Sequence, residues 1–235
     1  MNLKLLTRTK LRAIIALVLL HAAVSGANEI QNGGFETGDF QNWTVVDNSS
    51  GTFVDDGSGA GISPKSGKYL ALLGAFGSLG SLSQTITTLP GQPYLISLWL
   101  TNPDDSTPNE FVVQWNGNIL FDQTNIPALA WTNLQFTITA TDTSGALQFG
   151  YLNEHSFFGL DDVSANVIPP ALNIFTSDTN IVVTWPTNAQ NFTLRSTTNL
   201  VSPVWITNCG VTVVGDQNTV TNPISGAQMF YQLVQ

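Results

Sequence analysis

Short runs of β-branched and aromatic residues recur along the chain, separated by clusters of Gly, Asn, Asp, Ser and Pro. Such runs favour β-strands, and the clusters between them favour turns. Charged residues make up only 10% of the sequence, so helices have few residues from which to build exposed faces. The pattern predicts an all-β protein.

The part of the chain between residues 28 and 168 contains nine of these runs. That number suits a β-sandwich of two packed sheets. We expect strands at Thr44–Val46, Tyr69–Leu73, Leu82–Thr87, Tyr94–Thr101, Phe111–Trp115, Ile119–Asp122, Leu134–Thr141, Ala146–Leu152 and Gly159–Val167.

Two local patterns within this part predict specific strand geometry. Asn116-Gly117 separates two apolar runs, and Asn-Gly readily takes the positive φ angles of a type I′ turn, so the flanking runs should form an antiparallel hairpin. Apolar and polar residues alternate from Leu134 to Thr139. This period of two predicts a strand with one face on a core and the other in water.

The strand pattern breaks at Ile168-Pro169-Pro170, where two prolines cannot donate ladder hydrogen bonds. We interpret this point as a short, semi-rigid linker. A second, smaller β-sandwich is predicted over residues 171–235, from further strand-like runs at Leu172–Phe175, Ile181–Trp185, Phe192–Ser196, Val204–Thr207, Val211–Val214, Asn218–Thr221 and Met229–Val234.

Residues 1–27 have the pattern of a signal peptide. Four basic residues precede an apolar run from Ala13 to Val24, and the small residues Ser25 and Ala27 suit cleavage. The alternative, an uncleaved membrane anchor, is disfavoured because the apolar run is short for a bilayer span. We therefore expect export to the periplasm, the cell surface or the medium, with no membrane insertion after cleavage.

Cleavage makes the mature chain strongly acidic, because four of its seven basic residues lie in the signal peptide and none of its sixteen acidic residues do. Three basic residues against sixteen acidic ones leave a net charge of −13. Nucleic-acid binding relies on Lys and Arg to neutralise phosphates, so this chain is not expected to bind nucleic acid. Anionic membranes are poor partners for the same reason.

Cys209 is the single cysteine, so the fold has no intramolecular disulfide. With 208 residues after cleavage, the chain is long enough to depend on packed cores instead. Cys209 lies among Val, Ile and Thr without a histidine nearby in sequence, and we expect a buried, inert thiol. A nucleophile or an intermolecular crosslink is the alternative.

The predicted N-terminal sandwich, residues 28–168, resembles a known family. The segments NGGFETGDFQNW (32–43), SLSQTITTLPGQPYLISLWL (81–100) and FGYLNEHSFFGLDDVSA (149–165) are similar to the jelly-roll modules of the galactose-binding-like superfamily, which includes many carbohydrate-binding modules. They look closest to a version found in bacterial exported proteins that carry a PEP-type C-terminal sorting signal. The resemblance implies a jelly-roll fold and a non-catalytic, carbohydrate-binding role.

The second part resembles a different module. VVTWP, FTLRSTTNL, SPVWITN, NTVTNPISG and MFYQL are similar to segments of a fibronectin-type-III-like or immunoglobulin-like C-terminal module of secreted bacterial proteins. The chain ends at Gln235 without a Pro-Glu-Pro motif, an apolar helix or a basic tail, so we do not expect attachment through that sorting route.

The galactose-binding-like resemblance also implies a structural calcium ion, held by a Glu near the first strand and an Asp near the last. Carried over, the side-chain ligands are Glu36 and Asp161. Calcium takes six to eight oxygen ligands, which these carboxylates alone do not supply. In the alternative interpretation Glu36 caps a turn while Asp161 and Asp162 accept hydrogen bonds from loop amides, without any ion.

Sugar-binding modules usually present aromatic rings, on which the apolar face of a pyranose packs, beside groups that bind hydroxyls. Trp99 and Trp115 lie on predicted strands that we expect to be neighbours, and Gln114 and Glu154 are candidate hydrogen-bonding residues. In the alternative interpretation these tryptophans fill the core of the sandwich, as tryptophans normally do.

The sequence contains none of the common catalytic motifs that would indicate an enzyme. The mature chain has one histidine, His155, and no G-x-S-x-G, H-E-x-x-H or phosphate-binding glycine motif. Glu154-His155 and Asp161-Asp162 do not have the spacing of a known catalytic site. A polysaccharide or a cell-surface or matrix component is therefore the expected partner. The alternatives are a structural or adhesive surface protein and, more remotely, a small hydrolase.

Overall fold

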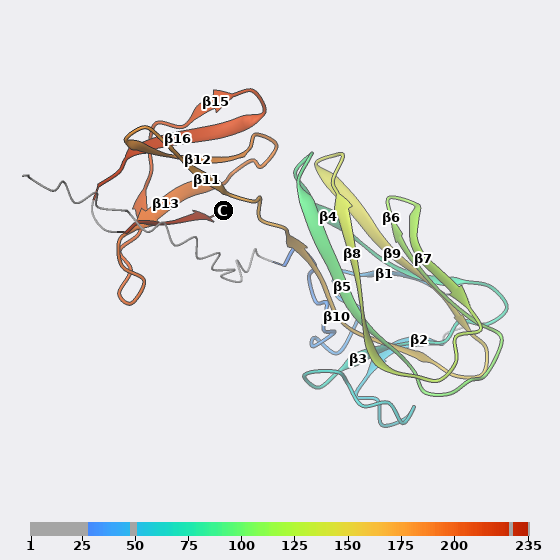
Figure 1. Cartoon of the computed structure of the whole chain (residues 1–235). Coiled ribbons are helices and arrows are strands. Elements are labelled where there is room, and N and C mark those ends of the chain that lie inside the picture. Colours follow the sequence, from blue (N-terminus) through green and yellow to red (C-terminus); the bar gives the residue numbers. More distant parts are fainter. Residues whose placement is uncertain (1–27, 48–50, 226–227, 235) are drawn as a thin grey trace, which may run out of the picture. The chain divides into compact units, whose positions relative to one another are not determined.

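The computed structural model describes residues 28–47, 51–225 and 228–234, and the signal peptide predicted at residues 1–27 lies outside this range. The described chain forms two compact units that divide between Ile168 and Pro169 (Figure 1). Every regular element described is a β-strand, and the predicted all-β fold is confirmed. No helix long and apolar enough to cross a membrane occurs in the described ranges.

The first unit is a sandwich of two five-stranded sheets, and all of its strand pairs are antiparallel. We name each sheet after one of its inner strands. The β6 sheet has the order β1 (Thr44–Val46), β4 (Gly80–Thr87), β9 (Ser144–Asn153), β6 (Asn109–Trp115) and β7 (Asn118–Thr124). The β5 sheet has the order β2 (Thr52–Asp55), β3 (Leu70–Leu73), β10 (Phe158–Val167), β5 (Pro93–Asn102) and β8 (Leu129–Thr139).

Aromatic side chains link the two sheets across the core. The rings of Phe111 on β6 and Phe149 on β9 stack at 6.0 Å, and Phe111 meets Phe158 of the other sheet edge-on at 5.6 Å. Trp43 packs against Phe149 from outside the strands, with 6.0 Å between ring centroids. Alternate residues of each strand supply this core, which is the period-two burial predicted for half-buried strands.

The predicted hairpin is present between β6 and β7. Asn116 and Gly117 have φ angles of +49° and +76°, as a type I′ turn requires, and the strands pair antiparallel. The register shifts between Val113 and Gln114, which places a bulge beside the turn.

The first and last strands of this unit, β1 and β10, do not lie side by side. β1 pairs with β4 in the β6 sheet, whereas β10 lies in the β5 sheet. The segment before β1 runs beside β10 instead: the Glu29 amide donates to Ala165 O (3.1 Å), and the Val163 amide donates to Gly33 O (2.9 Å). A Cβ at Gly33 would overlap the Val163 carbonyl, so this approach requires glycine.

The NGGFETGDFQNW segment is a compact loop that Asn32 organises. The Asn32 amide group donates to Asp39 O and Gln41 O at 3.0 and 3.2 Å, and the Trp43 indole donates to Asn32 O at 3.1 Å. Phe35 is fully buried at φ +56°, with its ring 5.8 Å from that of Trp43. The segment therefore has a structural role, because it packs Phe35 and Trp43 against the core of the sandwich.

The second unit contains a four-stranded and a three-stranded sheet. The first has the order β11 (Asn173–Ser177), β12 (Asn180–Pro186), β16 (Gln217–Pro223) and β15 (Thr212–Val214). The second has the order β14 (Ile206–Thr207), β13 (Thr193–Thr197) and β17 (Phe230–Val234). Their common core contains Val183, Trp185, Ala189, Leu194, Val220 and Leu233.

The expectation that Cys209 is buried is wrong. Cys209 is a free, exposed cysteine. It follows the two-residue strand β14 and lies in an irregular stretch before β15, so its apolar sequence neighbours do not form a strand that packs on the core. Trp205 in the same region is half-buried, whereas Trp185 is 2% exposed and lies in the core of the second unit.

Candidate functional site

The four predicted ligand-binding residues lie in different places. Trp115 is 6% exposed and packs inside the sandwich, where a Cβ at Gly145 would overlap its ring. The expectation that the strands of Trp99 and Trp115 are neighbours is wrong, because β5 and β6 belong to different sheets. Of the two tryptophans, only Trp99 is partly exposed.

Gln114 lies on the outer face of the β6 sheet. Its neighbours along β6, Val113 and Trp115, point into the core, so Glu110 and Gln114 point outward. The same alternation on the other strands defines an outward surface that we name the Gln114 face. It comprises Thr44, Val46, Ser81, Ser83, Thr85, Thr87, Glu110, Val112, Gln114, Ile119, Asp122, Thr124, Ser144, Ala146, Gln148, Gly150 and Leu152.

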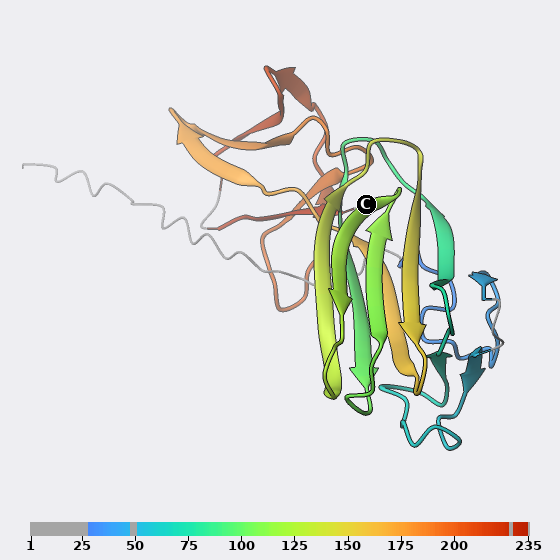
Figure 2. The ribbon, with the colours of Figure 1, turned by 90° about the vertical axis from the view of Figure 1, so that its right-hand side faces the viewer.

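Strand register aligns residues of this face into a row that crosses all five strands. Gln114 lies opposite Gln148 on β9, and Gln148 lies opposite Ser83 on β4. Thr44 on β1 and Ile119 on β7 complete the row. Neighbouring strands are about 4.8 Å apart, so the row is roughly 19 Å long. Figure 2 looks onto this face, where β6, β7 and β9 carry no other segment of the unit in front of them.

Several side chains on the Gln114 face that can form hydrogen bonds have no partner among the residues that the structure describes. Within the described ranges, the side chains of Gln114, Gln148, Ser83 and Glu110 make no hydrogen bond or ion pair with another residue. All four are half-buried. Side-chain amides both donate and accept hydrogen bonds, and hydroxyls do the same. The face therefore presents aligned polar groups, already partly withdrawn from water, to a ligand.

The charges on this face are all negative. Glu110 and Asp122 are its ionisable residues. The lysines of residues 28–168, Lys65 and Lys68, lie in the loop between β2 and β3, both of which belong to the other sheet. An anionic ligand would therefore find no countercharge on the Gln114 face.

The predicted calcium ligand Asp161 is fully buried on β10 and binds loop amides. Its Oδ2 accepts hydrogen bonds from the amides of Lys65 (2.9 Å) and Ser66 (3.2 Å), and its Oδ1 accepts one from Asp162 (2.7 Å). Burial raises the pKa of Asp161 to about 6, although these hydrogen bonds oppose the shift.

Glu36 holds the other end of the same loop. Its carboxylate accepts hydrogen bonds from the amides of Lys68 (2.9 and 3.1 Å) and Tyr69 (3.1 Å). Gly67 has φ +61°, and a Cβ there would overlap the Glu36 carboxylate. Glu36 and Asp161 therefore fix the loop of residues 65–69 from opposite ends, which is the arrangement of amide hydrogen bonds that the ion-free interpretation describes.

The fit of these carboxylates to calcium is incomplete. Glu36, Asp161 and Asp162 all approach Gly34, each with an atom within 3.8 Å of the position where a Cβ would lie. The described residues nevertheless contain no group of three or more His, Cys, Asp or Glu arranged to hold a metal ion. Calcium would have to compete with the amide hydrogens that Glu36 and Asp161 accept, and its presence stays a prediction.

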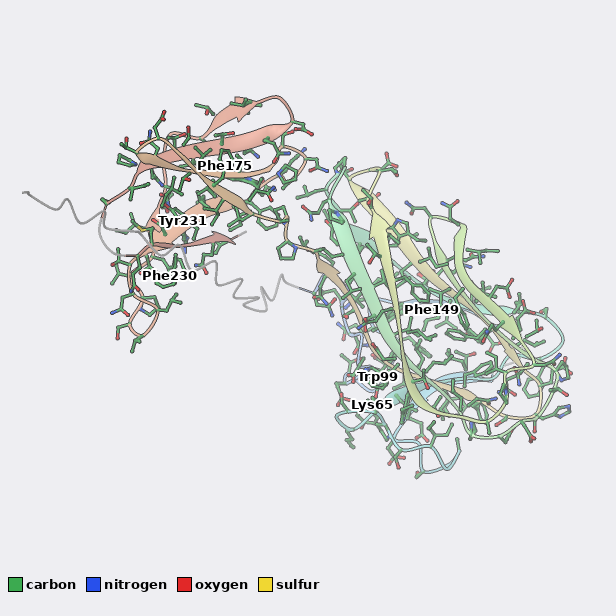
Figure 3. The ribbon with its side chains drawn as sticks, viewed as in Figure 1. Lys65, Trp99, Phe149, Phe175, Phe230 and Tyr231 are labelled. Carbon is green, nitrogen blue, oxygen red and sulfur yellow. The ribbon has the colours of Figure 1, made fainter. Side chains whose placement is uncertain are left out.

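Trp99 lies directly beside this anchored loop. It is the register partner of Asp161 across β5 and β10, and the Lys65 ammonium lies 4.0 Å from its ring centroid (Figure 3). Asn133 on β8, the other partner of Trp99, donates to Ser97 Oγ at 2.8 Å. A cation therefore already covers the half-buried ring of Trp99, which makes it a less open platform than the sequence predicts.

Glu154 positions a loop at one end of the sandwich. Its carboxylate accepts a hydrogen bond from the Gly77 amide at 3.1 Å. Asp104 lies close enough to His155 for the imidazole to contribute to a lowered pKa of Asp104, behind the larger effect of the Ser106 amide. Glu154 and Asp161 thus bind different loops.

Comparisons with known proteins gave structural similarities only. No protein-family model matches the chain, and no curated protein matches it. Among solved structures, TmCBM61 in complex with β-1,4-galactotriose aligns with a TM-score of 0.47 and 20% identity, over 60% of this chain and 99% of that one. The CBM22-1 xylan-binding domain of Paenibacillus barcinonensis Xyn10C aligns at 0.44 and 20%, over 64% and 100%.

An adhesin domain is also similar. The K1 cleaved adhesin domain of Lys-gingipain from Porphyromonas gingivalis aligns with a TM-score of 0.42 and 13% identity, over 55% of this chain and 96% of that one. With TM-scores below 0.5, these similarities do not decide a function, which must rest on the residues of the chain itself.

Proposed function

We propose that the chain is an exported, non-catalytic carbohydrate-binding protein, and that polysaccharide lies on the Gln114 face. The observation that carries this proposal is the row across five strands, whose three central members, Ser83, Gln148 and Gln114, are half-buried and have no protein partner among the described residues. A sugar hydroxyl donates and accepts hydrogen bonds at once, and side-chain amides match it in both respects. The ligand is a neutral polysaccharide, because the ionisable groups of the face are acidic.

The dimensions of the row favour a polymer over a single sugar. A row of roughly 19 Å, from five strands about 4.8 Å apart, spans several sugar rings. The three inner strands of the sheet, β4, β9 and β6, each contribute one hydrogen-bonding side chain to the row. These side chains are Ser83, Gln148 and Gln114, in that order. An extended chain that crosses the strands would meet one such group per strand.

The composition of the face favours sugar over a protein partner. Protein interfaces usually have an apolar, aromatic centre surrounded by a polar rim. The large apolar side chains exposed on the Gln114 face, Val46 and Ile119, lie on its two outermost strands. Its centre consists mainly of glutamine, serine and glycine, together with Ala146, the half-buried Leu152 and a valine that is 5% exposed. Without an aromatic platform, binding there depends on hydrogen bonds and is weak per sugar unit.

Affinity electrophoresis in gels that contain neutral polysaccharides tests the proposal. The protein should be retarded, and the double variant Gln114→Ala/Gln148→Ala should lose roughly tenfold in affinity, since each hydrogen-bonding side chain contributes about 0.5–1.5 kcal/mol. Gln135→Ala is the matched control, because Gln135 is an exposed glutamine on β8 of the other sheet. It should bind as the unsubstituted protein does.

Trp99→Ala distinguishes the two faces of the sandwich. If retardation depends on Trp99 and not on Gln114 and Gln148, the site lies on the β5 sheet and the proposal is wrong. If a broad panel of polysaccharides retards nothing, with or without calcium, the structural or adhesive alternative is favoured over sugar binding.

A further inference from the structure

The second unit exposes a concentrated stretch of apolar side chains. Of the thirteen large hydrophobic residues exposed in the described structure, six lie between residues 201 and 214. Their exposed fractions run from 46% to 92%: Val201, Val204, Ile206, Val211, Val213 and Val214. Three of them, Val211, Val213 and Val214, lie on or beside β15, and exposed apolar side chains grouped on an edge strand usually mark an interaction site.

Both sheets of the second unit end on this stretch, which we name the edge segment (residues 201–214). β14 is the outer strand of the three-stranded sheet, and β15 is the outer strand of the four-stranded sheet. All three residues of β15 are exposed, and among the described strands β15 pairs only with β16. The free side of β15 therefore offers unpaired backbone groups to another strand.

The distribution of charge indicates which molecule could supply a strand that pairs with β15. Residues 28–168 carry two lysines against fourteen acidic residues, a net charge of −12, whereas residues 171–235 carry Asp178, Asp216 and Arg195. The edge segment contains no charged residue at all. Two copies of this acidic chain repel one another over most of their surface, and the edge segment is where they can meet without burying a charge.

We propose that a second copy of this chain docks on the edge segment, with β15 of each copy pairing antiparallel across a two-fold axis. Such an interface is isologous, so one patch serves both partners. Pairing centred on Val213 sets Val213 against Val213 of the other copy, and cross-strand pairs of β-branched residues favour antiparallel sheets. The two four-stranded sheets become one continuous sheet, and the dimer is independent of any sugar ligand.

Sedimentation equilibrium over a hundredfold range of concentration tests this proposal, with a reductant present so that Cys209 cannot form a disulfide. The chain should show a monomer–dimer equilibrium that strengthens with salt, because salt screens the repulsion between acidic copies. Val213→Asp should shift the dissociation constant upward by tenfold or more. Phe175→Asp, at a 51% exposed position on the opposite edge strand β11, is the matched control and should leave the equilibrium unchanged.

Circular dichroism melts show whether both variants remain folded, as 65% exposure of Val213 predicts. A monomer at every concentration overturns the proposal, as does a dimer that Val213→Asp leaves intact. Spin labels on Cys209, the single thiol, supply the geometry. Antiparallel pairing centred on Val213 places the two labelled residues at most about 30 Å apart. A dimer with a clearly longer distance has a different interface.

Discussion

The burial of Asp161 predicts that the stability of the folded protein depends on pH. Its pKa of about 6 in the folded protein exceeds the ordinary value of 3.8, so the folded state binds this proton more tightly than the unfolded state does. The corresponding contribution to stability is complete below about pH 4. It is lost as the pH rises through about 6, and it amounts to about 3 kcal/mol.

Urea unfolding of the protein and of Asp161→Asn, at pH 4 and pH 7 in the presence of a chelator, measures this contribution. Because asparagine does not titrate, the variant should gain stability relative to the unsubstituted protein as the pH rises, by about 3 kcal/mol in total. A stability difference between the two proteins that is the same at both pH values would contradict the assignment.

The absence of a side chain at Gly145 leaves room for the ring of Trp115. A Cβ there would overlap the ring of Trp115, which is 6% exposed and surrounded by core. Overpacking of this kind typically costs 1–3 kcal/mol, so we expect Gly145→Ala to lower the free energy of unfolding by about 2 kcal/mol. Gly59→Ala is the control, because a Cβ at Gly59 would meet only a carboxylate oxygen of Asp55 at 3.8 Å. Thermal melts compare the two, and equal melting temperatures would count against the packing described.

At the scale of elements, the sequence predicts most strands because their burial alternates along the chain. The run Leu134–Thr141 is an example, since β8 alternates half-buried and exposed residues over the same stretch. β2 escaped prediction because it has only four residues, between Gly51 and an Asp-Asp-Gly turn. The partnership of Gly33 with β10 also escaped, because no periodic pattern marks an extended segment outside the sheets.

The candidate site was predictable only in part. The adjoining Asn116-Gly117 hairpin, which is local information, predicts that Gln114 lies on a paired strand and on the opposite face from Trp115. Gln148 and Ser83 could not, because they meet Gln114 through pairings of strands distant in sequence. Trp115 was misleading for a similar reason, since sequence shows that a tryptophan alternates with Gln114 but not which of the two faces the core.

The loop of residues 65–69 is the element on which the calcium prediction is tested. If calcium binds at Glu36 and Asp161, it should hold this loop and raise the melting temperature of the protein over that in chelator. Glu36→Gln should remove the increase. Identical melting temperatures across a calcium titration would show that the amide hydrogen bonds to Glu36 and Asp161 hold the loop alone.

At the scale of the whole molecule, the two units differ in charge and in the polarity of their exposed surfaces. The N-terminal unit carries nearly all of the negative charge and the open, amide-rich Gln114 face, whereas the second unit is almost uncharged and exposes the edge segment. A sugar-binding unit joined to a unit that dimerises would present two binding faces together. Multivalent presentation raises the apparent affinity for a polymer when each site is weak.

The most direct test of polysaccharide binding on the Gln114 face is a two-dimensional ¹⁵N NMR titration of the protein with a soluble neutral polysaccharide that retards it. If polysaccharide binds there, the side-chain amide signals of Gln114 and Gln148, and the backbone signals of β4, β9 and β6, should shift together with one dissociation constant. The side-chain amides of Gln135 and Asn133 on the β5 sheet should not move. Shifts centred instead on Trp99 and β5, with the Gln114 and Gln148 signals unchanged, would contradict binding on the Gln114 face.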